Sequence, residues 1–281
     1  MSTNDRWVEY AFLTALVLVT FSLAIAFLPP GIDWRDTYRP AALALLQGAS
    51  PYTVDIFFAP PWSLIPLIPF ALLPVEIGRA MLFVVGLCSY AFTAYKLGAK
   101  ATGLAAFIAS PIVLHGLLNS NVEWLVLLGF VLPPQLGLFF VTIKPQIGIG
   151  MLVYWGIQGI RDNGIGQTVR DFLPISLVSL ASFAVFGLWP LRFRETLVLT
   201  RGYNASFWPF SIPIGLALLC LAFWRKDSRF AMAASPFISP YVLFHAWVGP
   251  LVSIVRSSIA VLLVVLALWV LVISILLSGP I

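Results

Sequence analysis

Charged residues are so sparse along the chain that the uncharged intervals between them predict its membrane spans. The first interval, Ala11–Leu28, ends at Pro29-Pro30-Gly31 and approaches the ~20 apolar residues that a bilayer-crossing helix needs. Nine more follow: Trp62–Val75, Ala80–Tyr95, Ala101–Leu118, Trp124–Ile143, Pro145–Ile160, Phe172–Leu191, Phe207–Trp224, Phe230–Pro250 and Ser257–Leu277. Because several are short, and Pro133-Pro134 interrupts one, the pattern predicts an all-α polytopic bundle of about 8–10 transmembrane helices.

The composition supports placing most of the chain in lipid. Apolar residues make up 60% of the 281 positions and charged residues 10%, with a mean hydropathy of +1.00. A soluble domain carries about 25% charged residues. This excludes a soluble enzyme, a nucleic-acid reader and a disordered chain. The apolar runs are continuous and do not alternate with period two, which disfavours a β-barrel. Cys88 and Cys220 lie inside apolar runs and are expected to be buried free thiols.

Three polar loops interrupt the apolar pattern of a single transmembrane domain, residues 1–281. The first, Gly31–Pro61 (31–61), contains AALALL, which predicts a short helix on the membrane surface. The second, Arg161–Asp171, has the composition of a hairpin connection. The third is Arg192–Ser206 (192–206). The N-terminal segment pairs Arg6 with acidic neighbours and has no small-residue cleavage site, so we expect the first span to be a retained anchor.

Charge counting does not orient these spans. Ten passes with the N-terminus inside leave seven basic residues inside and nine outside. The positive-inside rule predicts the opposite bias. One explanation is that outer basic residues serve an anion-binding site.

Four sequence elements occur in an order that resembles a known family. They are DWRDTYRPAALALLQGASPY from Asp33, FFAPPWSLIPLIPFALLP from Phe57, IKPQIGIG from Ile143 and SPYVLFHAWVGPL from Ser239. Together they resemble the polyprenol-phosphate-mannose-dependent mannosyltransferases of the GT-C superfamily, in a shortened form. The resemblance implies a GT-C-like fold with short surface helices in the first extracytoplasmic loop. It also places the Arg192–Ser206 loop on the extracytoplasmic side.

The resemblance implies transfer of a mannose-like hexose or a pentose from a polyprenyl-phosphate sugar to an acceptor hydroxyl. The leaving phosphate needs no strong general acid, but a base must remove the acceptor proton. Asp33 and Asp36 are the candidate catalytic residues, with Asp33 preferred because it directly precedes Trp34. The alternative is a solvated carboxylate paired with Arg35 or Arg39, and the three-residue spacing of Asp36 and Arg39 suits an ion pair.

Cations must also hold the donor phosphate. Lys144 lies between two apolar segments, where an ionised Lys costs about 2.5 to 3.5 kcal/mol, so it is a functional candidate. Alternatively, it ends a helix and snorkels to the interface. The other candidate phosphate-binding residues are Arg35, Arg194, Arg201 and His245. For His245, a packing role in an apolar helix is the competing interpretation. The motifs add four candidate substrate-binding residues: Tyr38, Tyr52, Gln146 and Tyr241.

The expected partners are a lipid-linked sugar donor and membrane lipids, with protein partners in a membrane complex left open and no nucleic acid. No cofactor is expected. No His/Cys/Asp/Glu cluster has metal-ligand spacing, although a divalent metal is left open. The expected location is the cell membrane, as a multi-pass protein with its active site on the extracytoplasmic side. Two alternatives remain: a catalytically silent GT-C-like subunit of a larger assembly, or a lipid or solute transporter with broken helices around a midplane site.

Overall fold

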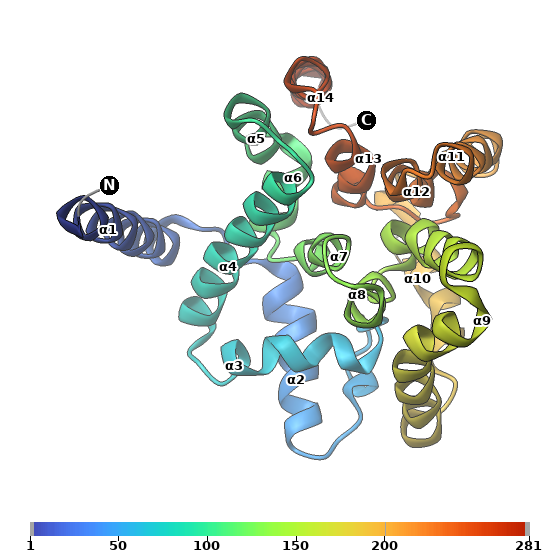
Figure 1. The fold of residues 1–281 in the computed structure, drawn as a ribbon. Helices are drawn as coiled ribbons and strands as arrows, with labels where there is room; N and C mark the ends of the chain where they lie inside the picture. Colours follow the sequence, from blue (N-terminus) through green and yellow to red (C-terminus); the bar gives the residue numbers. More distant parts are fainter. Residues whose placement is uncertain (1–2, 200, 279–281) are drawn as a thin grey trace.

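The computed structural model describes residues 3–199 and 201–278, and the regular secondary structure within these ranges is entirely helical (Figure 1). The longer helices are α1 (Thr3–Phe27), α2 (Arg39–Leu46), α4 (Val75–Lys96), α5 (Ala101–Ile108), α6 (Pro111–Leu118), α7 (Glu123–Gly129), α8 (Pro134–Val141), α9 (Pro145–Phe186), α10 (Phe193–Leu199), α11 (Ile212–Arg225), α12 (Ser228–Ala234) and α14 (Ser258–Ser278). The shorter elements are η1 (Trp34–Tyr38), η2 (Pro51–Thr53), η3 (Pro61–Leu67), α3 (Ile68–Ala71), η4 (Trp189–Arg192), η5 (Arg201–Tyr203), η6 (Ser235–Ile238), η7 (Phe244–Trp247) and α13 (Val248–Ser253).

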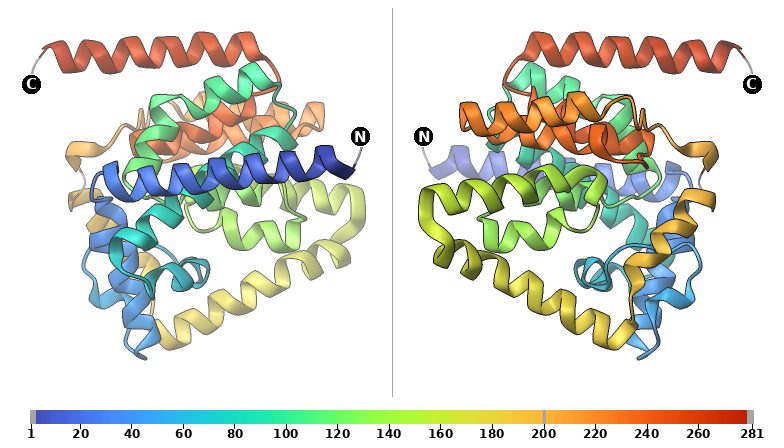
Figure 2. Two further views of the ribbon diagram at one scale, coloured as in Figure 1. Left: turned by 90° about the vertical axis from the view of Figure 1, so that its left-hand side faces the viewer. Right: turned by 90° about the vertical axis from the view of Figure 1, so that its right-hand side faces the viewer.

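Three of the described helices, α4, α9 and α14, are long and apolar enough to cross a membrane. A fourth candidate is the pair α5 and α6, which bend by 51° at a short break. Helix α9 contains a reversal at Gly164, whose φ of 81° lies outside the helical region. Figure 2 shows the second half folding back from this turn and diverging from the first half. The expected connection Arg161–Asp171 is therefore helical on both sides of a single glycine, which adopts this φ without a Cβ clash.

The long helices run roughly side by side, and α2 lies across them at one end of the molecule (Figure 2). We call this the loop end, because the first and third polar loops meet there. Arg192 Nη1 in η4 donates to Tyr52 O of the first loop at 2.8 Å. At the opposite end, Arg256 Nε donates to Leu97 O at 3.0 Å, and Lys226 lies 3.7 Å from Asp162. Helix α1 begins at the opposite end and α14 finishes at the loop end.

Two intervals predicted as passes do not run from one end to the other. The interval Trp62–Val75 forms η3 and α3 and stays at the loop end, where Trp34 Nε1 donates to Val75 O at 3.1 Å. The interval Trp124–Ile143 forms α7 and α8, of seven and eight residues, which are about 10 to 12 Å long. Glu123 before this hairpin and Lys144 after it are in contact, so the segment returns to its starting point.

The predicted pass Phe230–Pro250 is also broken. It consists of α12, η6, an extended stretch, η7 and α13. Its bend lies at the loop end, where Ser206 Oγ donates to Ser239 O at 2.6 Å. The segment therefore goes to the loop end and back. The two cysteines are free as expected, but both side chains are exposed on apolar helix surfaces, so the expectation that they are buried is wrong.

Glycines allow the helices around the short hairpin to approach closely. A Cβ on Gly148 in α9 would lie 2.0 Å from Val141 O of α8, and one on Gly150 would lie 2.2 Å from Ala231 O of α12. Small residues at such contacts are typical of packed membrane helices. These contacts fix the start of α9, and with it Lys144, against the elements that carry the rest of the site.

Candidate functional site

Five polar side chains from four regions of the chain meet near the loop end, and we call them the polar cluster. Asp33 follows α1, Asn121 and Glu123 stand at the start of α7, Lys144 lies between α8 and α9, and His245 is in η7. All except Asp33 are buried. The short hairpin α7–α8 brings Glu123 and Lys144 together, although 20 residues separate them in the sequence.

Glu123 is the centre of the cluster and is completely buried. Its Oε1 accepts a hydrogen bond from Lys144 Nζ and lies 3.1 Å from His245 Nε2. A buried carboxylate requires such partners, because an unpaired charge in a low-dielectric interior is strongly unfavourable. Its Oε2 has no hydrogen-bond partner among the described residues. The ion pair therefore holds the Lys144 ammonium inside the protein and not at its surface.

Asn121 links the buried ion pair to Asp33. Its Nδ2 donates to Asp33 Oδ2 at 2.6 Å and lies 3.1 Å from His245 Nε2. Its Oδ1 accepts hydrogen bonds from Lys144 Nζ and, at 3.3 Å, from Tyr38 OH. One amide thus contacts a carboxylate, an ammonium, an imidazole and a phenol, and fixes their relative positions.

Asp33 occupies the accessible edge of the cluster. Its side chain is only half-buried, and its backbone N–H donates to Asn119 O at 3.2 Å. Partial burial raises the pKa of the Asp33 carboxyl above its ordinary value, and the nearby Lys144 opposes this shift. The raised pKa makes the carboxylate a stronger base than a solvated aspartate.

A second histidine extends the cluster toward the exterior. His115 in α6 is exposed, and its Nδ1 lies 3.0 Å from Nδ1 of buried His245. The two rings stack with centroids 5.2 Å apart. Neither His115 nor Glu123 is singled out in the sequence analysis. The signal that could have revealed both is the polar run LLNSNVEWL, in which Asn119 follows His115 by one helical turn.

Asp36 lies outside the polar cluster. Its carboxylate accepts two hydrogen bonds from Arg35, at 2.6 and 2.8 Å. The Arg35 guanidinium lowers the pKa of the Asp36 carboxyl. Arg39 instead donates to Leu73 O at 3.3 Å. Of the two partners left open, Asp36 therefore pairs with Arg35 and not with Arg39, because the adjacent guanidinium reaches the carboxylate.

The predicted arginines stand apart from Lys144 and His245. Arg194 lines a hollow of about 610 Å³ at the loop end together with Asp55 and Glu195. Arg201 is exposed in η5. Among the described residues, no hydrogen bond or ion pair joins these two arginines or Arg35 to the polar cluster. The arginine that contacts the first loop from the third is Arg192, which the sequence analysis did not single out and whose guanidinium lies over the ring of Tyr52.

The four predicted substrate-binding residues have different surroundings. Tyr38 is part of the cluster environment through Asn121. Tyr52 donates from its OH to Ala59 O at 3.0 Å and stacks on Trp189, which is a packing arrangement. Gln146 is half-buried in the first turn of α9, two residues after Lys144. Tyr241 is buried just before η7.

Within the described residues, no group of three or more His, Cys, Asp or Glu side chains is arranged to hold a metal ion. The chain matches no family model, no curated protein and no solved structure.

Proposed function

We propose that this protein is a GT-C-like membrane glycosyltransferase that moves a sugar from a polyprenyl-phosphate donor to an acceptor hydroxyl. The observation that carries the proposal is the polar cluster. A half-buried carboxylate, Asp33, stands beside a buried Lys and His at the end of the molecule where the loops gather. The sequence motifs that resemble the family contribute Asp33, Lys144 and His245 to this one place.

The chemistry assigned to the cluster has two parts. Asp33 accepts the proton of the acceptor hydroxyl as the new bond to the anomeric carbon forms and the carbon–oxygen bond to phosphate breaks. The polyprenyl phosphate leaves as a stable anion. Lys144 has three N–H donors and uses two of them, on Glu123 and Asn121, so one remains for a phosphate oxygen.

Glu123 has a positioning role in this scheme. Its carboxylate contacts both Lys144 and His245 and is completely buried, so it holds these two side chains in place without being exposed itself. Ion pairs of this kind fix the geometry of functional groups more than they stabilise the fold. Arg192, Arg194 and Arg201 supply further positive charge at the loop end.

The distribution of basic residues supports an extracytoplasmic loop end. Of the ten predicted passes, two do not cross the molecule, Trp62–Val75 and Trp124–Ile143, and one crosses it twice, Phe230–Pro250. The chain therefore passes nine times between the two ends, and α1 and α14 both finish at the loop end (Figure 2). Nine of the 16 basic residues then belong to helix ends or connections at the opposite end: Arg6, Lys96, Lys100, Arg161, Arg170, Arg225, Lys226, Arg229 and Arg256. The positive-inside rule places that end in the cytoplasm.

The proposal is tested by sugar transfer in lipid nanodiscs. The purified protein is incubated with a panel of radiolabelled polyprenyl-phosphate hexoses and pentoses and with membrane glycolipid acceptors. We expect transfer of label from one donor, with release of polyprenyl phosphate. Absence of transfer together with absence of donor binding would contradict the enzyme assignment. Donor binding without transfer would indicate the catalytically silent subunit.

A transporter is the second candidate, and the α7–α8 hairpin is the observation that favours it. The hairpin leaves and re-enters the polar cluster, and Glu123, His245 and His115 form a chain of ionisable groups from a buried position to the surface. Such chains are typical of proton-coupled transport. Proton-dependent uptake of a solute into liposomes, without sugar transfer, would favour the transporter.

A further inference from the structure

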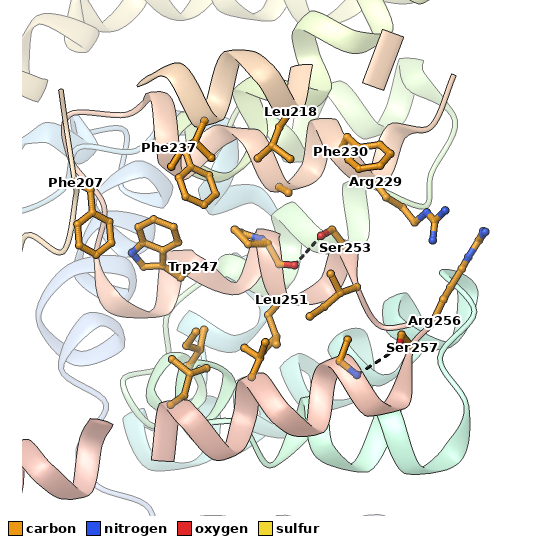
Figure 3. A pocket seen from close by; sticks show the side chains of 18 of the residues that line it. Phe207, Leu218, Arg229, Phe230, Phe237, Trp247, Leu251, Ser253, Arg256 and Ser257 are labelled. Carbon is orange, nitrogen blue, oxygen red and sulfur yellow. Dashed lines mark hydrogen bonds between the residues drawn. The ribbon is translucent and has the colours of Figure 1, made fainter. Parts of the chain in front are cut away.

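An apolar groove of about 870 Å³ lies between α14 and the layer formed by α11, α12 and α13. Figure 3 shows its walls running along α14. The α14 residues that line it are Ala260, Val264, Leu268 and Leu271, which follow one face of the helix. From Ser257 to Leu271 this face is about 21 Å long at 1.5 Å per residue. The groove is therefore longer than half of the ~30 Å hydrocarbon core.

Polar atoms in the groove are concentrated at the end opposite the polar cluster. Arg229, Arg256 and Ser257 lie there together (Figure 3). The one polar side chain further along, Ser253, has its hydroxyl bonded to Pro250 O at 2.7 Å. The middle of the groove thus offers only apolar surface, which suits a hydrocarbon chain.

The other end of the groove is closed by aromatic rings. Trp247 packs against Phe207 and Phe237, with ring centroids 5.5 and 5.0 Å away. Its Nε1 donates to Ala205 O at 3.2 Å, which holds the indole in place. A molecule whose headgroup sits at the polar cluster would have to displace these rings to place its chain in the groove.

Arg256 is held so that it presents donors at the open end. Its Nε donates to Leu97 O, and its stem packs on Gly98, where an added Cβ would lie 3.2 Å from Arg256 Cγ. Its two terminal amino groups make no hydrogen bond among the described residues, although the Asp227 carboxylate is close enough to interact with Arg256 electrostatically. Arg229 is paired with Asp227 at 2.5 Å, so the three side chains together carry a net charge of about +1. Fixed guanidinium donors of this kind match phosphate oxygens.

We propose that this groove binds one chain of an anionic phospholipid, with its phosphate at Arg256 and Ser257. The occupant follows from two features: a chain-shaped apolar space, and a single positive charge at its open end. Basic pockets between membrane helices bind anionic headgroups in this way. The site is separate from the polar cluster and does not depend on the proposed sugar transfer.

The test is lipid retention by the whole protein, measured by native mass spectrometry. The protein is delipidated in detergent and exposed to equal amounts of dioleoylphosphatidylglycerol and dioleoylphosphatidylcholine. We expect preferential retention of one phosphatidylglycerol. Arg256→Gln should reduce that preference about tenfold or more, because it removes a charge-assisted contact. Arg225→Gln is the matched control, since Arg225 is exposed at the same end but does not line the groove.

Two further variants keep the test decisive. Val264→Trp fills the groove and should lower retention of both lipids, while Arg256→Lys should restore part of the preference for phosphatidylglycerol. Soluble glycerol phosphate should not displace the lipid, because the chain contributes most of the contact. Three results would overturn the proposal. The parental protein could retain the two lipids equally, the Arg225 and Arg256 variants could have equal effects, or the protein could form a lipid-free dimer that covers the groove.

Discussion

Removing Lys144 should strongly destabilise the protein, because it leaves the Glu123 carboxylate short of its main partner. Glu123 is completely buried, and among the described residues its Oε1 is paired with Lys144 and His245 alone. Breaking a buried ion pair by removing one member costs about 3 to 5 kcal/mol. We expect a loss of this size in the free energy of unfolding of Lys144→Met. The measurement is equilibrium unfolding in mixed micelles with increasing fractions of denaturing detergent.

The double variant separates a charge effect from a packing effect. Glu123→Gln combined with Lys144→Met removes the unpaired charge, so it should be about 1 to 3 kcal/mol more stable than Lys144→Met alone. Lys226→Met is the matched control, because Lys226 pairs with Asp162 at 3.7 Å on an exposed surface and should change stability little. If the double variant is as unstable as the sum of the two single variants, the buried ion pair is not the reason for the loss.

Three more predictions follow from the structure. The rate of sugar transfer should fall as the pH decreases through the raised pKa of Asp33, because only the ionised carboxylate accepts a proton. In a pH–rate profile, this fall in rate should begin at a higher pH than a solvated aspartate would give. Single cysteines at Asp55 and Ser206 should react with an impermeant maleimide from the same side of sealed vesicles, and labelling from opposite sides would contradict the fold. Gly148→Ala should lower the unfolding temperature, because its Cβ would lie 2.0 Å from a backbone carbonyl of α8, whereas Gly166→Ala, with no neighbouring atom within 4 Å, should not.

The sequence could predict the helical membrane class but not which apolar intervals cross the molecule. An uncharged run such as Trp124–Ile143 has the same hydropathy whether it crosses or turns back. The deciding contact is Lys144 with Glu123, which joins the two ends of the hairpin and involves residues far apart in the chain. Pro133-Pro134 was the local sign of the turn. In the proposed nine-passage arrangement Lys96 and Lys100 lie at the end opposite the loops, whereas the ten-pass count puts them on the side of the loops.

The candidate site was predictable only where a residue type was unusual for its surroundings. Lys144 attracted attention because a charge between apolar segments is costly. Asn121 did not, since asparagines are common at helix ends, yet it contacts four other members of the site environment. Asp33 and Asp36 share one loop in the sequence. Their different roles depend on which way the backbone turns at η1, which buries Trp34 and leaves Arg35 exposed beside Asp36.

The most direct test of the proposed function compares sugar transfer by Asp33→Asn and Asp36→Asn in the same nanodiscs. Asp33 contacts Asn121 of the polar cluster, while Asp36 is paired with Arg35 at the surface. A general base contributes about 10² to 10⁴ in rate. We therefore predict that Asp33→Asn lowers turnover at least about 100-fold with donor binding nearly unchanged, and that Asp36→Asn lowers it much less. Transfer at the parental rate by the Asp33 variant would contradict the account.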